Sequence, residues 1–121
     1  MWKIKQSLLL DASDSAKRYY PDEFMCFIGG NAKSEIADEI VLLPTYNDTT
    51  SASILESVIP IDASIIGTLH SHPDSSARPS DADKNFFMKH KLNIILGSPF
   101  SIQSAAFYDE KGKRITVTIT P

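Results

Sequence analysis

The sequence predicts an α/β fold, a single-domain mixed β-sheet flanked by helices. Three observations lead to this prediction: a length of 121 residues, a helical repeat of apolar residues near the N-terminus, and a series of later apolar runs of strand length. The length is typical of one domain, so we expect one domain over residues 1–121. The same length excludes a (β/α)₈ barrel, which needs about 200 residues or more.

The first expected element is an amphipathic helix over residues 6–20. Four residues recur along it at spacings of four, four and three: Leu8, Ala12, Ala16 and Tyr19. These spacings place the four side chains on one face of a helix. Pro21 should end the helix, because proline has no backbone N–H to donate.

The later apolar runs predict strands. The first covers residues 24–28 and is closed by a turn at Gly29-Gly30-Asn31. Further strands are expected over residues 36–43, 54–59, 65–72, 92–96, 102–108 and 115–119. A loop is expected over residues 45–53, and a second helix from about Pro79-Ser80 to His90. The last two strands predict a hairpin with one wet face.

Charge and cysteine content narrow the classes of function. Twelve basic and fifteen acidic residues give a net charge of −3, which leaves no basic excess for a nucleic-acid backbone. Cys26 is the single cysteine, so no internal disulfide or cysteine-rich zinc site can form. A free thiol fits a reducing compartment. With no apolar leader or membrane span in view, we expect a cytoplasmic protein that binds neither nucleic acid nor membranes.

Two histidines at the end of the strand over residues 65–72 indicate a metal site. His70 and His72 point to the same face, because side chains alternate along a strand. A third ligand must come from elsewhere, since catalytic zinc usually takes three protein ligands and a water. Asp83, at the start of the second predicted helix, can return a carboxylate to the pair. Taken alone, Ser80 and Asp83 are better explained as a helix-capping pair.

The complete pattern resembles the signature of the JAMM, or MPN+, metalloproteases. It runs His70-x-His72-Pro73, continues to Pro79, and ends Ser80-x-x-Asp83. That family also places a glutamate upstream beside an apolar strand, where this chain has Glu23. The resemblance extends from the first helix to about Ser98 and implies the MPN/JAB fold, a cytidine-deaminase-like sandwich. The compact chain is similar to the stand-alone archaeal and bacterial members.

The resemblance also implies a chemistry. His70, His72 and Asp83 would hold one Zn²⁺ per chain, with a water as the fourth ligand. Glu23 would take a proton from that water and deliver it to the leaving amine, and the Ser80 hydroxyl would donate to the developing oxyanion. The implied substrate is the bond after the C-terminal Gly-Gly of a ubiquitin-like modifier, free or in its conjugates. We expect residues 45–59 to line the groove for this tail.

Two alternative functions are compatible with the same residues, and three other classes of metal-dependent hydrolase are excluded. Processing of a ubiquitin-fold sulfur-carrier protein would use the same site, and a non-catalytic MPN-type scaffold would share the fold. Amidohydrolases need a barrel, zinc deaminases need a cysteine pair, and no His-Glu-x-x-His motif is present. Without the motif, Glu23 would be interpreted as a solvated residue after Pro21. Cys26 is expected to be a small buried hydrophobic residue, and His90 to be structural or solvated and not a ligand. Trp2 and Ile4 either edge a dimer or cover the core, so both monomer and homodimer stay open.

Overall fold

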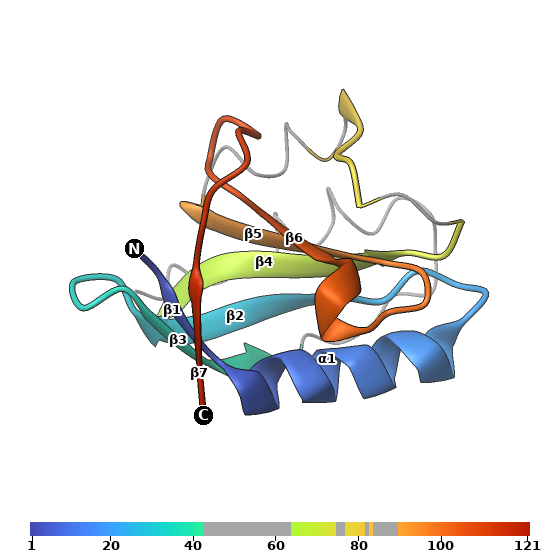
Figure 1. Ribbon diagram of the computed structural model, residues 1–121, viewed down its shortest axis with the longest axis horizontal. Helices are drawn as coiled ribbons and strands as arrows, with labels where there is room; N and C mark the ends of the chain where they lie inside the picture. Colours follow the sequence, from blue (N-terminus) through green and yellow to red (C-terminus); the bar gives the residue numbers. More distant parts are fainter. Residues whose placement is uncertain (43–63, 75–76, 82, 84–89) are drawn as a thin grey trace.

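The computed structural model describes residues 1–42, 64–74, 77–81, 83 and 90–121. Within these ranges the chain forms a seven-stranded mixed sheet in the order β6-β5-β4-β2-β3-β1-β7. The strands are β1 (Lys3–Lys5), β2 (Met25–Asn31), β3 (Ile36–Val41), β4 (Ile65–His72), β5 (Leu92–Gly97), β6 (Ala105–Tyr108) and β7 (Thr118–Thr120). The helix α1 (Gln6–Tyr19) lies across one face of the sheet, and the short 3₁₀ helix η1 (Ile102–Ser104) lies near it (Figure 1). The predicted mixed α/β fold is confirmed.

The helix predicted near the N-terminus is α1. It ends at Tyr19, and the N–H of its C-cap residue Tyr20 donates to the Ala16 carbonyl, next to Pro21 as expected. Three of the four residues of the predicted face are buried, whereas Tyr19 is 39% exposed and contacts the ring of Phe24. The buried residues of the helix are Leu8, Leu9, Ala12, Ser13 and Ala16.

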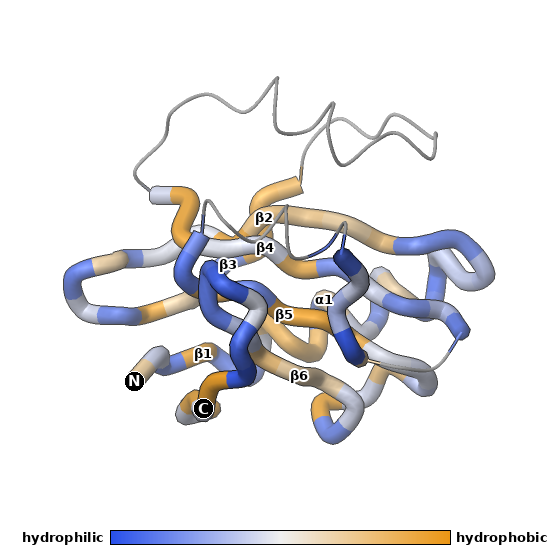
Figure 2. Tube along the Cα trace, turned by 90° about the horizontal axis from the view of Figure 1, so that it is seen from above, coloured by the Kyte–Doolittle hydropathy of each residue, from blue (hydrophilic) through white to orange (hydrophobic). Residues whose placement is uncertain are grey.

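The sheet separates a large apolar core from a small one. The large core lies between α1 and the sheet and takes alternate residues of the central strands, such as Ile28, Leu69 and Ile94. The small core, on the opposite face, is formed by Phe27, Ile95, Ala106 and Tyr108. Figure 2 shows β2 and β5 largely in hydrophobic colours and the turns between strands in hydrophilic ones. β2 and β5 therefore contribute apolar side chains to both cores, one on each face of the sheet.

The turn predicted at residues 29–31 is wrong. β2 continues through both glycines to Asn31 and pairs with β3, with a bulge between Gly29 and Gly30. Gly30 is needed here for close packing, because a Cβ at this position would lie 2.0 Å from the Ile36 carbonyl oxygen. A glycine pair after an apolar run can thus mark a bulge in place of a turn.

The predicted C-terminal hairpin forms only next to its turn, where the Asp109 N–H donates to the Lys113 carbonyl and the Ile115 N–H to the Phe107 carbonyl. β6 begins at Ala105, after η1, and its partner beyond the turn is reduced to a single bridge between Tyr108 and Arg114. β7 instead pairs in parallel with β1, at the far edge of the sheet. Ile115 and Val117 pack against the large core on the way. Because these two side chains pack on the core, the chain leaves β6 after the turn and crosses to the opposite edge of the sheet.

The N-terminus is part of the sheet, which the sequence did not predict. Trp2 and Ile4 are buried in the large core around β1, so they cover the core. The predicted strands over residues 36–43, 65–72 and 92–96 correspond to β3, β4 and β5. Asp81 and Asp83 are helical. The loop over residues 45–53, the strand over 54–59 and most of the second helix lie outside the described residues.

Among the described residues, no helix has the length and apolar character to cross a membrane.

The contact between β4 and β5 leads to a prediction about stability. A Cβ on Gly67 would lie 2.4 Å from the backbone oxygen of Leu92, whereas a Cβ on Gly29 would meet only the side chain of Glu39. The Glu39 side chain can rotate away, but the β5 backbone cannot. We expect Gly67→Ala to lower the free energy of unfolding by about 2 kcal/mol or more and Gly29→Ala by clearly less. Urea unfolding of both variants tests this, and equal losses would contradict it.

The buried thiol gives a second prediction. Burial raises the pKa of Cys26 from 9.0 to about 12, so the unfolded chain ionises this thiol at lower pH than the folded protein. The stability that depends on the neutral thiol is complete below pH 9 and is lost as the pH rises toward 12. Urea unfolding should show the stability difference between the wild type and Cys26→Ala shrinking above pH 9, by roughly 1 kcal/mol per pH unit. A difference that stays constant between pH 8 and about 10.5 would refute this.

Candidate metal centre

Two imidazole rings project from the end of β4. The strand covers Ile65–His72, as predicted, and it pairs with β2 on one side and β5 on the other. His70 lies opposite Met25 and Ile95 in this register, so both rings are on the face away from α1. Their Nε2 atoms are 3.1 Å apart. The two histidines therefore converge as the alternation of a strand predicts.

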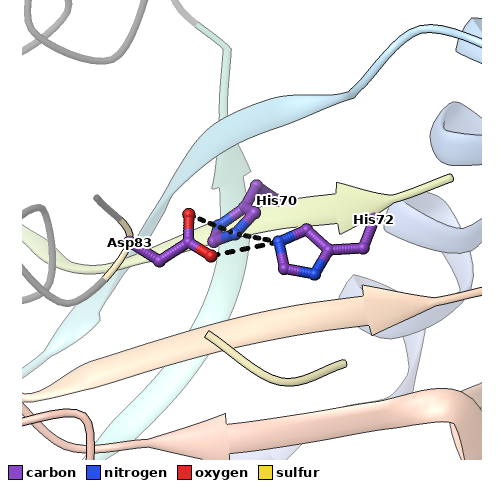
Figure 3. A group of neighbouring side chains, drawn as sticks. All are labelled: His70, His72 and Asp83. Carbon is purple, nitrogen blue, oxygen red and sulfur yellow. Dashed lines mark hydrogen bonds and ion pairs between the residues drawn. The ribbon is translucent and has the colours of Figure 1, made fainter. Parts of the chain in front are cut away.

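The carboxylate of Asp83 completes the cluster. Its Oδ1 lies 3.2 Å from the Nε2 of His70, and its Oδ2 lies 3.1 Å from the Nε2 of His72. Figure 3 shows both rings turned toward this carboxylate. His70 is 1% exposed, and the side chains of His72 and Asp83 are 17% and 16% exposed. The three groups thus meet in a site that is largely, but not fully, closed to water.

A reciprocal pair of hydrogen bonds holds Asp83 in place. The N–H of Ser80 donates to the Oδ2 of Asp83 (2.8 Å), and the N–H of Asp83 donates to the Ser80 hydroxyl (3.1 Å). This is the geometry of a capping box at the start of a helix, so the predicted capping pair is confirmed. The cap also orients the carboxylate oxygen that faces His72.

The donor set fits a zinc ion. Two ring nitrogens and a carboxylate oxygen lie within 4.8 Å of one another. Tetrahedral zinc with bonds of 2.0–2.1 Å requires its ligand atoms to be about 3.3 Å apart. The observed separations of 3.1–3.2 Å between these atoms are close to that value. Small movements of the side chains are enough to admit an ion, and the cluster could hold one.

Asp83 is ionised at neutral pH. Burial by itself raises the pKa of its carboxyl group. The hydrogen bonds from His70 and His72, the charge of His70 and the hydrogen bond from the Ser80 N–H act in the opposite direction and prevail, so the pKa of Asp83 lies far below its usual range. A permanently charged carboxylate beside two imidazoles attracts a divalent cation.

Glu23 lies beside this cluster, but does not take part in its hydrogen bonds. β2 and β4 pair Met25 with His70, and two hydrogen bonds between Phe24 and Ser71 extend the pairing by one residue. The next step sets Glu23 opposite His72. Burial raises the pKa of Glu23 above its ordinary value, although the charges of His70 and His72 act to lower it. The predicted glutamate therefore lies opposite His72 in the continued β2–β4 pairing, and its carboxyl holds a proton more readily than an ordinary glutamate does.

One further side chain supports the site and was not foreseen. The hydroxyl of Tyr108, on β6, donates to the Ala77 carbonyl at 2.6 Å. This bond ties the segment that leads to Ser80 and Asp83 to the edge of the sheet. The only sequence signal was a tyrosine at the end of an apolar strand, which many strands share.

Two residues that the sequence analysis assigned to structural roles lie apart from the cluster. Cys26 is 3% exposed and belongs to the large core on the α1 side. The ring of His90 packs edge-on against Phe27, and its carbonyl accepts a hydrogen bond from Asn93. Both structural interpretations agree with these positions.

Known proteins are similar to this chain in sequence and in fold. Residues 5–109 match the family model described as "prokaryotic homologs of the JAB domain". A protein of Haloferax volcanii named "probable metalloprotease" is 28% identical over 111 residues, covering 84% of this chain and 69% of the relative. The family match spans most of the chain, including both histidines, Ser80 and Asp83.

Three solved structures have a fold similar to that of this chain. A JAB1/MPN domain protein from Archaeoglobus fulgidus is 31% identical with a TM-score of 0.78, covering 98% of this chain and 99% of its own. A structure described as "JAMM: a metalloprotease-like zinc site in the proteasome and signalosome" is 29% identical with a TM-score of 0.78, covering 100% and 99%. A protein from Desulfitobacterium hafniense, 16% identical over 99% of this chain and 93% of its own, shares the fold with a TM-score of 0.62. Because the family model covers residues 5–109 and the His-His-Asp cluster lies within it, this chain belongs to the prokaryotic JAB-domain family of JAB/MPN proteins.

Proposed function

We propose that this protein is a zinc-dependent peptidase or isopeptidase that hydrolyses the bond after the C-terminal Gly-Gly of a ubiquitin-like modifier. One observation carries the proposal: His70, His72 and Asp83 converge on one point, and the strand register sets Glu23 beside them. A metal site needs only the first three groups. Hydrolysis needs a fourth group that can move a proton, and Glu23 is suited to that role.

Hydrolysis would require two functions from the protein, binding of the metal and transfer of a proton, and different residues supply them. Zinc held by His70, His72 and Asp83 would polarise the scissile carbonyl and lower the pKa of a water molecule to about 7. Glu23 accepts the proton of the attacking water, because burial raises the pKa of its carboxyl. The same carboxyl then gives the proton to the departing amine, and Glu23 returns to its ionised state.

Ser80 can stabilise the oxygen that becomes negative. Its hydroxyl oxygen already accepts the Asp83 N–H. A serine hydroxyl has one proton to donate besides its acceptor positions, so capping leaves that proton available. Capping and oxyanion stabilisation are therefore compatible in one side chain, and the exposed position of Ser80 leaves it accessible to a substrate.

The choice of substrate rests on the family and on the physical nature of a Gly-Gly tail. Two glycines let an extended backbone approach a recessed metal more closely than other residues do. Such a tail can also add to a sheet as an extra strand. We further propose a cytoplasmic location, because the free thiol of Cys26 suits a reducing compartment. The proposed partner is the modifier protein or its conjugates, and residues 45–59, proposed to line the groove, lie outside the described residues.

Processing of a ubiquitin-fold sulfur carrier is the nearest alternative. It needs the same site and the same Gly-Gly tail, and differs only in the group that is attached to the tail. Cleavage of a lysine-linked conjugate indicates deconjugation, whereas cleavage of only a linear extension after Gly-Gly indicates processing. A non-catalytic scaffold is disfavoured, because it has no need for an intact metal cluster with a carboxylate beside it.

Metal content gives the first test. We expect about one zinc per chain in protein purified without chelator. His70→Ala and Asp83→Ala should lose it, because each removes one of three protein ligands. His90→Ala is the matched control and should keep the metal, because the His90 ring packs on Phe27. Elemental analysis after gel filtration measures the stoichiometry, and a folded wild type that takes up no zinc would refute the metal assignment.

Glu23 gives the second test. Glu23→Gln keeps the size of the side chain but cannot take a proton, so zinc content should be unchanged while cleavage falls by roughly 10²- to 10⁴-fold. The control is Asp22→Asn, which neutralises the adjacent exposed carboxyl and should cleave at the wild-type rate. Products from a Gly-Gly fusion and a lysine-linked conjugate are identified by mass. Wild-type rates in Glu23→Gln would show that another group moves the proton.

A further inference from the structure

Ser71 lies between the two histidines on β4 and has no part in the cluster itself. It is fully buried, with 0% of its surface exposed. The alternation of the strand turns its side chain away from the face that carries the rings of His70 and His72. A buried hydroxyl in such a place calls for an explanation, because an apolar residue would fill the same volume without a desolvation cost.

The hydroxyl of Ser71 takes the place of a backbone acceptor. In a regular antiparallel pair, two opposed residues exchange two backbone hydrogen bonds. Ser71 and Phe24 make the first of these, from the Ser71 N–H to the Phe24 carbonyl at 2.9 Å. The Phe24 N–H donates instead to the Ser71 Oγ, at 2.8 Å. The side chain of Ser71 therefore determines how the chain approaches β4 at this point.

Phe24 is the residue directly after Glu23. Its own side chain is buried, and its ring contacts that of Tyr19 at a centroid distance of 5.2 Å. Phe24 is thus held from two directions, by the core through its ring and by β4 through its backbone. Glu23 is partly desolvated but keeps much of its surface exposed, and its backbone is joined directly to that of Phe24.

We propose that Ser71 is a positioning residue for Glu23. Its hydroxyl ties the backbone next to Glu23 to the strand that carries His70 and His72, so the carboxylate and the two rings keep one fixed spacing. This inference rests on the proposed function only in taking Glu23 as the proton carrier. The tie itself is a property of the fold, and it can be measured without activity.

Hydrogen exchange tests the tie directly. In Ser71→Ala the Phe24 amide loses its acceptor, so its exchange rate should rise at least ten-fold relative to the wild type, in both metal-free and zinc-loaded protein. The amides of β5, which do not bond to this hydroxyl, should keep their protection. Unchanged exchange at Phe24 would overturn the proposal, whether or not the protein cleaves anything.

Kinetics test the consequence. A misplacement of about 1 Å at a reacting group can cost 10²-fold in rate, so kcat of Ser71→Ala should fall about 10- to 100-fold. KM and zinc content should stay within about two-fold, because no substrate contact or metal ligand is removed. The control is Ser13→Ala, which deletes another buried serine hydroxyl, on α1, and should leave kcat unchanged. An equal loss in both variants would indicate a general effect of destabilisation and overturn the proposal.

A double-mutant cycle shows whether Ser71 acts through Glu23. If it does, Ser71→Ala added to Glu23→Gln should lower the residual rate by no more than about two-fold. A further ten-fold loss would overturn the proposal. If Ser71→Ala does not fold, Ser71→Cys keeps a similar volume with a weaker acceptor and should show smaller changes in exchange and kcat, in the same direction. The wild type could fail to cleave either substrate while Ser71→Ala still shows faster exchange at Phe24. That result would refute the proposed function and would leave the hydrogen bond between Ser71 and Phe24 established.

Discussion

The antiparallel register between β2 and β4 is the constraint on which the rest of the site depends. It places Met25 opposite His70 and leads Glu23 toward His72. Because side chains alternate along a strand, a slip of one residue would turn both rings from the open face into the core beneath α1. Close packing constrains β4 on its other side as well, since a side chain at Gly67 would collide with the β5 backbone. The chemistry of the site is thus fixed by backbone contacts that involve no reactive group.

The site combines a rigid part with a tethered part. His70 and His72 belong to a strand that is paired on both sides and covered by apolar residues of two cores. Asp83 comes from a segment whose described contacts include the cap with Ser80 and the bond from Tyr108 to Ala77. Two ligands are therefore positioned by the fold itself, and the third by local hydrogen bonds. An ion that binds all three joins the tethered segment to the sheet.

The sequence predicts what is local and fails where the partner is distant. Residues 65–72 are predicted to the residue, because alternation and Pro73 define the strand without reference to any neighbour. The residues at 115–119 alternate equally well, but alternation does not name a partner, and β7 pairs with β1 instead of β6. The glycines at 29 and 30 signal a turn as readily as a bulge, and only the nearby Ile36 carbonyl decides between them. Asp83 is predicted from its place at the start of the next expected helix, but Glu23 is found only through the family pattern, since no periodicity relates it to the histidines. Ser71 occupies the unspecified position between the two histidines of the motif, so the sequence offers no reason to predict a role for it.

The large apolar core gives the fold a source of stability that does not involve the candidate metal ligands. None of the three converging residues belongs to it, and its members lie under α1 and on the opposite face of the sheet. In small zinc domains the ion supplies the folding free energy, and the ligands come together only when it binds. Here the sheet brings two imidazoles to within 3.1 Å of each other through its own hydrogen bonds and apolar burial. The fold therefore carries the cost of crowding these polar groups, and an ion would bind to three side chains that already face one another.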